Sequence, residues 1–185
     1  MSGLFDFTHA IARVPGPSVV KGLRDGERDD PNFDLIVVEH EAYVAALREA
    51  GVEVDLLPVA RDFPDSIFVE DVALVFGEGA ILLKTAAESR AGEAALMAPV
   101  LDRHFGTVLS LADGHVDGGD VLVTPDGVII GLSARTDPAG AGALCGLLAS
   151  LGKRANVAQT PRGILHFKTG CGMIDEETVF VAPPL

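Results

Sequence analysis

Apolar residues in this chain gather in short runs that come in pairs, and a tight polar turn separates the two runs of each pair. Short apolar runs bounded by turn residues are typical of β-strands, and two runs across such a turn are typical of a β-hairpin. The turns lie roughly 50 residues apart, a spacing typical of repeat architectures. We therefore predict three hairpins, with strands at residues 67–75 and 80–83, 120–124 and 128–132, and 172–174 and 178–182.

Outside these hairpins the apolar residues take the three-to-four-residue spacing of an amphipathic helix. Gly51 and Gly152 are expected to end two of the helices, because glycine readily adopts the left-handed conformation of a helix C-terminus. The repeating module is hairpin, helix, strand, and the predicted fold class is α/β with ββαβ-type modules. Helices are predicted at residues 39–50, 88–105 and 139–151, followed by strands at 52–57, 106–110 and 156–158.

Each such module has one apolar face that only a neighbouring module can cover. The third hairpin is followed by Pro183, Pro184 and Leu185, where another helix and strand would be expected. The repeat therefore predicts that the fold continues beyond Leu185, and a shorter, self-contained variant closed by the two prolines is the alternative. Length and hydrophobic content predict one domain, residues 1–185.

The chain is acidic, with a formal net charge of -13. A field of this sign repels nucleic acid and anionic membranes and attracts cationic solutes, although an acidic surface also serves solubility alone. No apolar run approaches the ~20 residues of a membrane helix, and residues 1–6 lack the features of a signal peptide. The two cysteines form no Cys-x-x-Cys pair, which indicates reduced thiols and a cytoplasmic protein.

Polar clusters interrupt the predicted strands at three places. In the first, Asp65 is followed by the adjacent acids Glu70 and Asp71, which would point to opposite faces of a strand. One of the two acids would then be buried or face a cleft, and a buried carboxylate needs a cation beside it. That cation is a bound ligand or, alternatively, the side chain of Arg90 or Arg135.

The second cluster is Asp117-Gly118-Gly119-Asp120, which opens a predicted strand and not a helix, so it is not a phosphate-binding loop. Paired glycines allow a ligand to approach the backbone closely, whereas a simple turn with two solvated aspartates is the alternative. His115, Asp117 and Asp120 are also candidate metal ligands. Their spacing matches no common metal-binding motif, and we predict no metal site.

The third cluster contains His166, whose apolar neighbours suit an imidazole with a tuned pKa or, alternatively, a buried core histidine. Cys171 follows five residues later and is a candidate nucleophile. Five residues of extended strand span about 17 Å, so contact would need a sharp turn at Gly170, and this role is the less favoured one. Cys145 lies on the apolar face of a predicted helix and is expected in the core.

The chain resembles the dimethylarginine dimethylaminohydrolases of the guanidino-group-modifying (amidinotransferase) superfamily. The resemblance is densest in the segments Pro-Asp-Ser-Ile-Phe-Val-Glu-Asp-Val-Ala (64–73), Asp-Gly-Gly-Asp-Val-Leu (117–122), Gly-Leu-Ser-Ala-Arg-Thr (131–136) and His-Phe-Lys (166–168). It implies a pentein-like α/β propeller, a ring of five modules with a central active site, here an incomplete ring. The Val-Glu-Asp-Val-Ala stretch favours this branch over arginine deiminases.

The resemblance also implies roles for the polar residues. His166 would be the proton donor and general base, and Asp117 would hold the guanidinium group and orient the histidine. The implied substrate-binding residues are Leu23 in a lid segment, Asp65, Glu70 and Asp71 for the cationic groups, and Arg90 and Arg135 for the amino-acid carboxylate. The family's nucleophilic cysteine would lie beyond Leu185, and Cys171 does not match it. Phe167 and Thr169 stand where leucine and serine are commoner.

The implied reaction is the hydrolysis of an Nω-methylated arginine to citrulline and a methylamine, without a metal or cofactor. The alternatives are a non-catalytic binder of arginine-like ligands and an arginine deiminase-type hydrolase. The expected partner is a small cationic substrate, and the open faces of an incomplete ring make a homo-oligomer possible.

Overall fold

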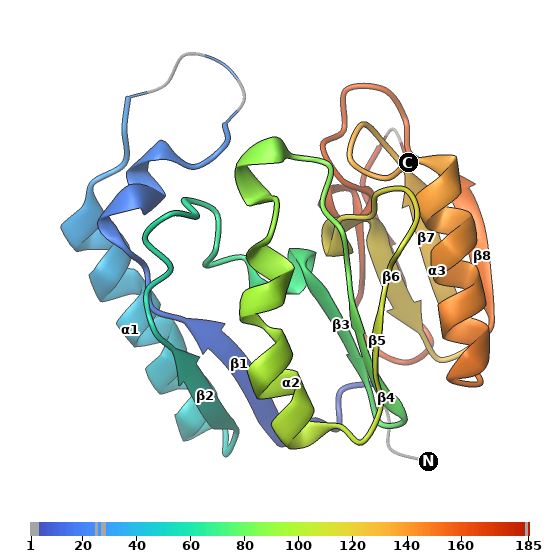
Figure 1. Ribbon diagram of the computed structural model, residues 1–185, viewed down its shortest axis with the longest axis horizontal. Coiled ribbons are helices and arrows are strands. Elements are labelled where there is room, and N and C mark those ends of the chain that lie inside the picture. The colour runs from blue at the N-terminus through green and yellow to red at the C-terminus, as the bar shows by residue number, and fades with distance from the viewer. Residues whose placement is uncertain (1–3, 25, 27–28, 184) are drawn as a thin grey trace. The chain divides into compact units, whose positions relative to one another are not determined.

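A computed structural model describes residues 4–24, 26, 29–183 and 185 (Figure 1). The chain divides into two compact units, Asp6–Val69 (the first unit) and Met1–Phe5 with Glu70–Leu185 (the second unit). Each is described by itself, and the single domain expected from the sequence stays a prediction. Among the described helices, none combines the length and apolar character that crossing a membrane requires.

The first unit contains two parallel strands and the helix that connects them. Strand β1 (His9–Arg13) was not predicted; it pairs in parallel with β2 (Glu53–Leu57), and the 3-10 turn η1 (Pro17–Lys21) follows β1. Helix α1 (Phe33–Glu49) begins earlier than predicted, because the Asn32 side chain accepts a hydrogen bond from the backbone of Leu35 and caps it. The helix ends at Glu49, and Gly51, the glycine expected to end it, has the left-handed φ of 87° just after the helix.

The second unit contains the predicted modules. In the first module, β3 (Ala73–Phe76) and β4 (Gly79–Leu82) form a hairpin, and β5 (Val108–Ser110) runs parallel to β4. The order of hairpin, helix and strand predicted from the sequence is confirmed here, and the structure adds that the last strand is parallel to its neighbour.

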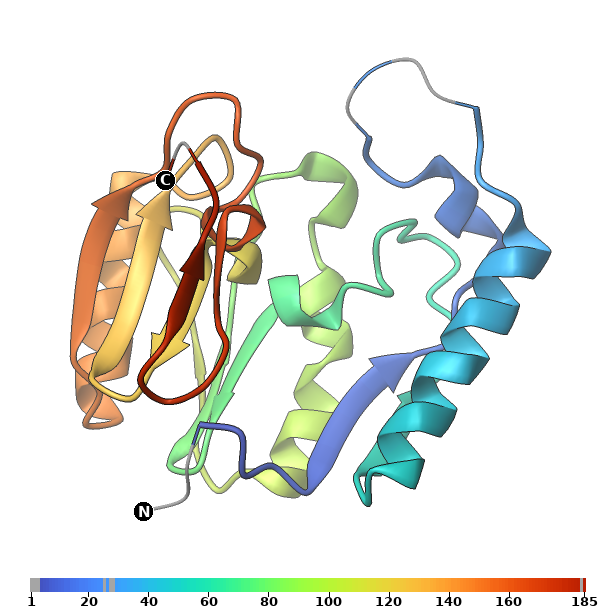
Figure 2. The same ribbon diagram turned by 180° about the vertical axis from the view of Figure 1, so that it is seen from behind.

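The second module repeats this order. Strands β6 (Val121–Thr124) and β7 (Gly127–Leu132) form its hairpin, and β8 (Ala155–Gln159) pairs in parallel with β7. Helix α3 (Pro138–Ser150) lies against β7 and β8 (Figure 1). A third hairpin, β9 (Cys171–Met173) with β10 (Val179–Val181), is drawn dark red in Figure 2.

The helix predicted at residues 88–105 is wrong in its extent. The segment forms two short 3-10 turns, η3 (Glu88–Arg90) and η4 (Glu93–Leu96), before the regular helix α2 (Ala98–His104). Gly92 between the two turns has φ at 90°, a left-handed conformation that interrupts a right-handed helix. The apolar spacing was helical, but the backbone conformation at Gly92 decided the structure.

The starts of the three hairpins also differ from the prediction. Each hairpin is preceded by one 3-10 turn, namely η2 (Val69–Asp71), η5 (Gly118–Asp120) and η6 (Phe167–Thr169). These turns begin at residues 69, 118 and 167, which is every 49 residues. The polar clusters therefore lie in or beside tight turns at the ends of strands and not within the strands themselves.

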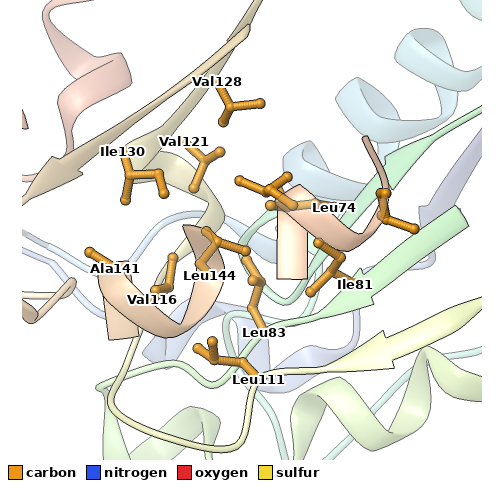
Figure 3. Packing of buried hydrophobic residues seen from close by; sticks show 12 residues of the cluster. Leu74, Ile81, Leu83, Leu111, Val116, Val121, Val128, Ile130, Ala141 and Leu144 are labelled. Carbon is orange, nitrogen blue, oxygen red and sulfur yellow. The ribbon is translucent and has the colours of Figure 1, made fainter. Parts of the chain in front are cut away.

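Apolar side chains of both complete modules pack into one core of the second unit (Figure 3). Ile81 of β4, Ile130 of β7, and Leu144 and Leu148 of α3 are fully buried there. Burying an aliphatic side chain of this size contributes roughly 1.5–3 kcal/mol. The core thus holds the sheets and α3 in a fixed arrangement, and the 3-10 turns project from the ends of these sheets.

Candidate active site

The 3-10 turns η2, η5 and η6, which precede the three hairpins, meet through direct contacts. The backbone N–H of Gly119 in η5 donates a 3.0 Å hydrogen bond to Oδ1 of Asp71 in η2. A Cβ atom on Gly118 would lie only 1.9 Å from the carbonyl oxygen of Glu70, and one on Gly119 would lie 2.8 Å from Cγ of His166. The two glycines are therefore needed for close packing, and they bring Asp71, the aspartates of η5 and His166 together.

Asp71 forms a buried ion pair. Its Oδ2 accepts a 2.6 Å hydrogen bond from Nη1 of Arg90, whose Nε donates to Oε2 of Glu93, also at 2.6 Å. Burial alone would lower the pKa of Arg90, but the carboxylates of Glu93 and Asp71 outweigh it and raise that pKa, so Arg90 stays charged. The arginine partner that the sequence analysis weighed for this carboxylate is present, whereas the role of Arg90 in holding a substrate carboxylate stays a prediction.

Asp117 is a buried carboxylate with few partners. Its Oδ1 accepts a long 3.3 Å hydrogen bond from the backbone of Ala86, while Oδ2 is buried without a hydrogen bond among the described residues. Nη1 of Arg135 lies 3.8 Å from Oδ2, at the outer limit of an ion pair. Burial, and then the nearby carboxylate of Asp71, raise the pKa of Asp117.

Asp120 is also buried, but it is fully hydrogen-bonded. Its Oδ2 accepts hydrogen bonds from the hydroxyl groups of Ser133 and Thr136, both at 2.7 Å, and Oδ1 accepts one from the backbone N–H of Phe167 at 2.8 Å. Burial would raise the pKa of Asp120, but the interaction with His166 and these hydrogen bonds lower it below its ordinary value. Asp120 therefore carries a stable negative charge inside the site.

His166 lies immediately before η6, with its ring against Gly119. Its Nδ1 is 3.5 Å from Oδ2 of Asp120. The carboxylate of Asp120 raises the pKa of His166 against the opposing effect of burial, and Asp71 and Asp117 act in the same direction. An imidazole in this setting can carry and release a proton.

Glu70 and Arg135 are the more exposed residues of this group. Oε2 of Glu70 pairs with Nζ of Lys168 at 3.2 Å, and the side chain of Arg135 is about one-quarter exposed. The backbone N–H of Arg135 donates to Oγ of Ser133, so the loop that carries Arg135 is tied to the same hydroxyl that contacts Asp120. Six of the predicted site residues thus belong to this one group of turns in the second unit: Glu70, Asp71, Arg90, Asp117, Arg135 and His166.

The other two predicted site residues, Leu23 and Asp65, lie in the first unit and contact each other. The backbone N–H of Leu23 donates a 2.9 Å hydrogen bond to Oδ1 of the buried Asp65, and a Cβ atom on Gly22 would lie 2.8 Å from the same oxygen. The side chain of Leu23 is exposed. The contact ties the segment around Leu23 to the turn that carries Asp65.

Cys171 is not placed as a nucleophile. Its thiol is buried and contacts the carbonyl oxygen of Phe167 at 3.4 Å, and burial raises its pKa, which keeps it protonated. Cys145 packs against the main core of the second unit, as expected. His115, one of the candidate metal ligands, pairs with Asp137 at 3.1 Å, and the described residues contain no group of three or more His, Cys, Asp or Glu arranged to hold a metal ion.

Sequence reasoning missed two residues of this site. Glu93 is almost fully buried beside Arg90. The two residues are three apart in the sequence, a spacing at which an ion pair could have been predicted. Asp120 was considered as a solvated turn residue or as a metal ligand, and the two glycines before it were the available signal of close packing. Its hydrogen bonds to Ser133, Thr136 and Phe167 depend on the tertiary fold, and no local pattern predicts them.

Comparison with known proteins agrees with this geometry. The family model described as arginine deiminase matches residues 58–185. Dimethylarginine dimethylaminohydrolases from Pseudomonas aeruginosa and Streptomyces coelicolor are each 35% identical over 178 residues, which covers 95% of this chain and 70% and 69% of theirs. The solved structure of a variant of the Pseudomonas aeruginosa enzyme in complex with citrulline superimposes with a TM-score of 0.93, at 35% identity, covering 97% of this chain and 71% of that one.

The repeated modules are those of the α/β propeller, or pentein, class, so the fold class predicted from the sequence is confirmed. Within that class, the chain belongs to the dimethylarginine dimethylaminohydrolase family. That the ring is incomplete stays a prediction.

Proposed function

We propose that this chain takes part in the hydrolysis of an Nω-methylated arginine to citrulline and a methylamine. The observation that carries the proposal is Asp117: a buried carboxylate whose Oδ2 has no hydrogen bond among the described residues and whose pKa is raised. A carboxylate in this setting gains from a cation that donates hydrogen bonds, and a guanidinium group is such a cation. Family membership supports the same substrate class.

The chemistry assigns separate tasks to the residues. Asp71 and Asp117 hold the guanidinium group while a thiolate attacks its central carbon, and they stabilise the charge of the tetrahedral intermediate. His166 protonates the departing amine and then takes a proton from the water that hydrolyses the thiol adduct. Further contacts come from Leu23, Asp65 and Glu70 to the cationic groups, and from Arg90 and Arg135 to the amino-acid carboxylate.

The proposed reaction needs a cysteine thiolate, and neither cysteine of residues 1–185 is placed to supply it. Cys171 donates to a backbone carbonyl and keeps its proton, and Cys145 packs against the core. The reaction needs a thiolate and two proton transfers, and the proposal therefore includes no metal or organic cofactor. The acidic chain suits a cationic small molecule as partner, and we propose a cytoplasmic protein that can form a homo-oligomer.

An arginine deiminase-type reaction is the second candidate, because the matching family model is described as arginine deiminase. The two reactions share the thiolate attack and differ in the amine that leaves, which is ammonia from arginine and a methylamine from a methylated arginine. An assay that measures the amine released from arginine and from a methylated arginine distinguishes the two reactions. A non-catalytic binder would hold both ligands and release neither amine.

Calorimetric titration of residues 1–185 with Nω,Nω-dimethylarginine tests the binding part of the proposal. We expect Asp117→Asn to weaken binding about 10-fold or more, because the buried carboxylate is lost while the size of the side chain is kept. Asp126→Asn, in the exposed turn between β6 and β7, is the matched control and should bind as the unmodified chain does. Equal affinities of the two variants would contradict the role of Asp117.

A further inference from the structure

We propose that Glu93 is a positioning residue that acts on Asp71 through Arg90: by offsetting the positive charge of Arg90, it lets that arginine fix Asp71 in place without neutralising it. The inference rests on the function proposed above, in which Asp71 holds the guanidinium group of the substrate. Glu93 is almost fully buried, and the proposed reaction gives it no other task.

Asp71 is fixed at both of its carboxylate oxygens. Its Oδ1 accepts a 3.0 Å hydrogen bond from the backbone N–H of Gly119, and its Oδ2 accepts one of 2.6 Å from Nη1 of Arg90. A carboxylate offers roughly four acceptor positions, so each oxygen can accept a further hydrogen bond from a ligand. The protein therefore orients Asp71 and leaves it able to bind a guanidinium group.

The ion pair with Arg90 works against this task of Asp71. The positive charge of Arg90 cancels the attraction of the carboxylate for a ligand cation and repels the guanidinium group of the ligand. The pair is buried, with 4% of the Arg90 side chain and 11% of the Asp71 side chain exposed, so salt and solvent screen it little. Asp71 and Arg90 alone would form a neutral pair that attracts a cation weakly.

Glu93 offsets the charge of Arg90 from another edge of the guanidinium group. Its Oε2 accepts a 2.6 Å hydrogen bond from Nε of Arg90, and its Oε1 accepts one of 3.3 Å from Nη2, whereas Asp71 is bound to Nη1. Two-point pairing with an arginine is typical of an ionised carboxylate. One arginine thus lies between two carboxylates, and the three charges together leave one negative charge beside the proposed ligand.

Stability alone does not call for Glu93 at this position. Arg90 already has Asp71 as a partner, and a second buried carboxylate adds its own desolvation penalty. Apolar residues of similar volume often stabilise a fold as well as a buried ion pair does, because they have no hydration to lose. An apolar residue cannot supply a negative charge, and this charge is what a site for a cation needs.

Asp117 reports the charge balance around Arg90 without any ligand. Burial and then the carboxylate of Asp71 raise the pKa of Asp117, whereas the positive charge of Arg90 lowers it. Glu93→Gln leaves Arg90 less compensated and should lower the pKa of Asp117, measured by carboxyl-carbon NMR on residues 1–185. Glu93→Asp keeps the charge and should lower it less. An unchanged pKa of Asp117 in Glu93→Gln would overturn the proposal.

Two ligands separate the charge of Glu93 from a merely structural role. Nω,Nω-dimethylarginine is cationic at its side-chain end, whereas citrulline has the same amino-acid end and a neutral side chain. In calorimetric titrations, Glu93→Gln should lower the ratio of the two affinities about 10-fold, because it keeps the size of the side chain and removes its charge. Glu78→Gln, in the more exposed pair with Lys153, is the matched control and should leave the ratio unchanged. An equal loss for both ligands, or no loss, would overturn the proposal.

A double variant keeps the test decisive if Glu93→Gln does not fold. Arg90→Gln combined with Glu93→Gln removes one positive and one negative charge, and the N–H of Gly119 still fixes Asp71. The ratio should stay within about threefold of that of the unmodified chain, and a larger fall would contradict the role of charge. If the unmodified chain binds neither ligand, the proposed function fails, whereas the pKa of Asp117 still decides the role of Glu93.

Discussion

Asp71, Asp117 and Asp120 show how surroundings give different properties to one residue type. Asp71 is paired with Arg90. Three hydrogen-bond donors and His166 lower the pKa of Asp120 and keep its carboxylate ionised. Asp117 has a raised pKa and an oxygen without a hydrogen bond among the described residues. Burial is common to all three, so the number of donors around each carboxylate decides its charge and its use.

Asp117→Asn should stabilise the folded chain near neutral pH while it weakens ligand binding. The pKa of Asp117 is raised by folding, so its ionised form destabilises the fold above that pKa and makes no difference below the pKa of the unfolded chain. Thermal melts near pH 7 should show a higher Tm for the variant, and melts near pH 3 should coincide. A lower Tm near pH 7 would contradict this account of the site.

Arg90→Ala should destabilise the second unit strongly. The substitution leaves the buried carboxylates of Asp71 and Glu93 without their cation, a change that costs about 3–5 kcal/mol. Lys153→Ala removes a more exposed pair with Glu78 and should cost less than about 1 kcal/mol. Urea unfolding of both variants measures the difference, and similar losses would show that burial of the Arg90 network carries little energy.

At the scale of elements, the hairpins and α3 could be predicted because their signals are local. Turn residues and apolar periodicity define β4 to β10 and α3 to within a few residues, whereas β3 begins six residues later than predicted. The 3-10 turns could not be predicted, since residues 67–69 are apolar like a strand and the contacts of η5 with Glu70 and Asp71 depend on the tertiary fold. Gly118 packs against the carbonyl of Glu70, which lies 48 residues earlier in the sequence. A local sequence pattern does not predict a contact between such distant residues.

The site shows the same division between local and tertiary information. The family resemblance supplied the residues proposed to touch the substrate, whereas Glu93 and Asp120, which hold other side chains, became visible only in three dimensions. Supporting residues of this kind act through hydrogen bonds between distant segments. Their position in a sequence carries no periodic signal.

Two glycines of α3 provide a matched test at this scale. Gly142→Ala should raise the stability by up to about 1 kcal/mol, because the position is open and alanine is the better helix former. Gly140→Ala should lower it, because a Cβ atom there would lie 2.3 Å from the carbonyl oxygen of His115. Thermal melts of the two variants decide the matter, and a gain from Gly140→Ala would contradict the packing of α3 on the loop before η5.

For the whole molecule, the net charge of -13 and the family membership point to the same ligand. An acidic protein attracts a molecule with a guanidinium side chain, and citrulline, the proposed product, lacks that charge. The change in charge during the reaction thus favours binding of substrate over product. Ligand binding and turnover are separate properties. The proposed thiolate is needed for turnover and not for binding.

The central claim is tested most directly by measuring citrulline and dimethylamine formed from Nω,Nω-dimethylarginine by the full-length protein that contains these 185 residues. We expect equal amounts of the two products, a loss of about 100-fold or more in His166→Gln, and no loss in His104→Gln, an exposed histidine of α2. Failure to form citrulline from any methylated arginine, or equal activity of the two histidine variants, would contradict the account.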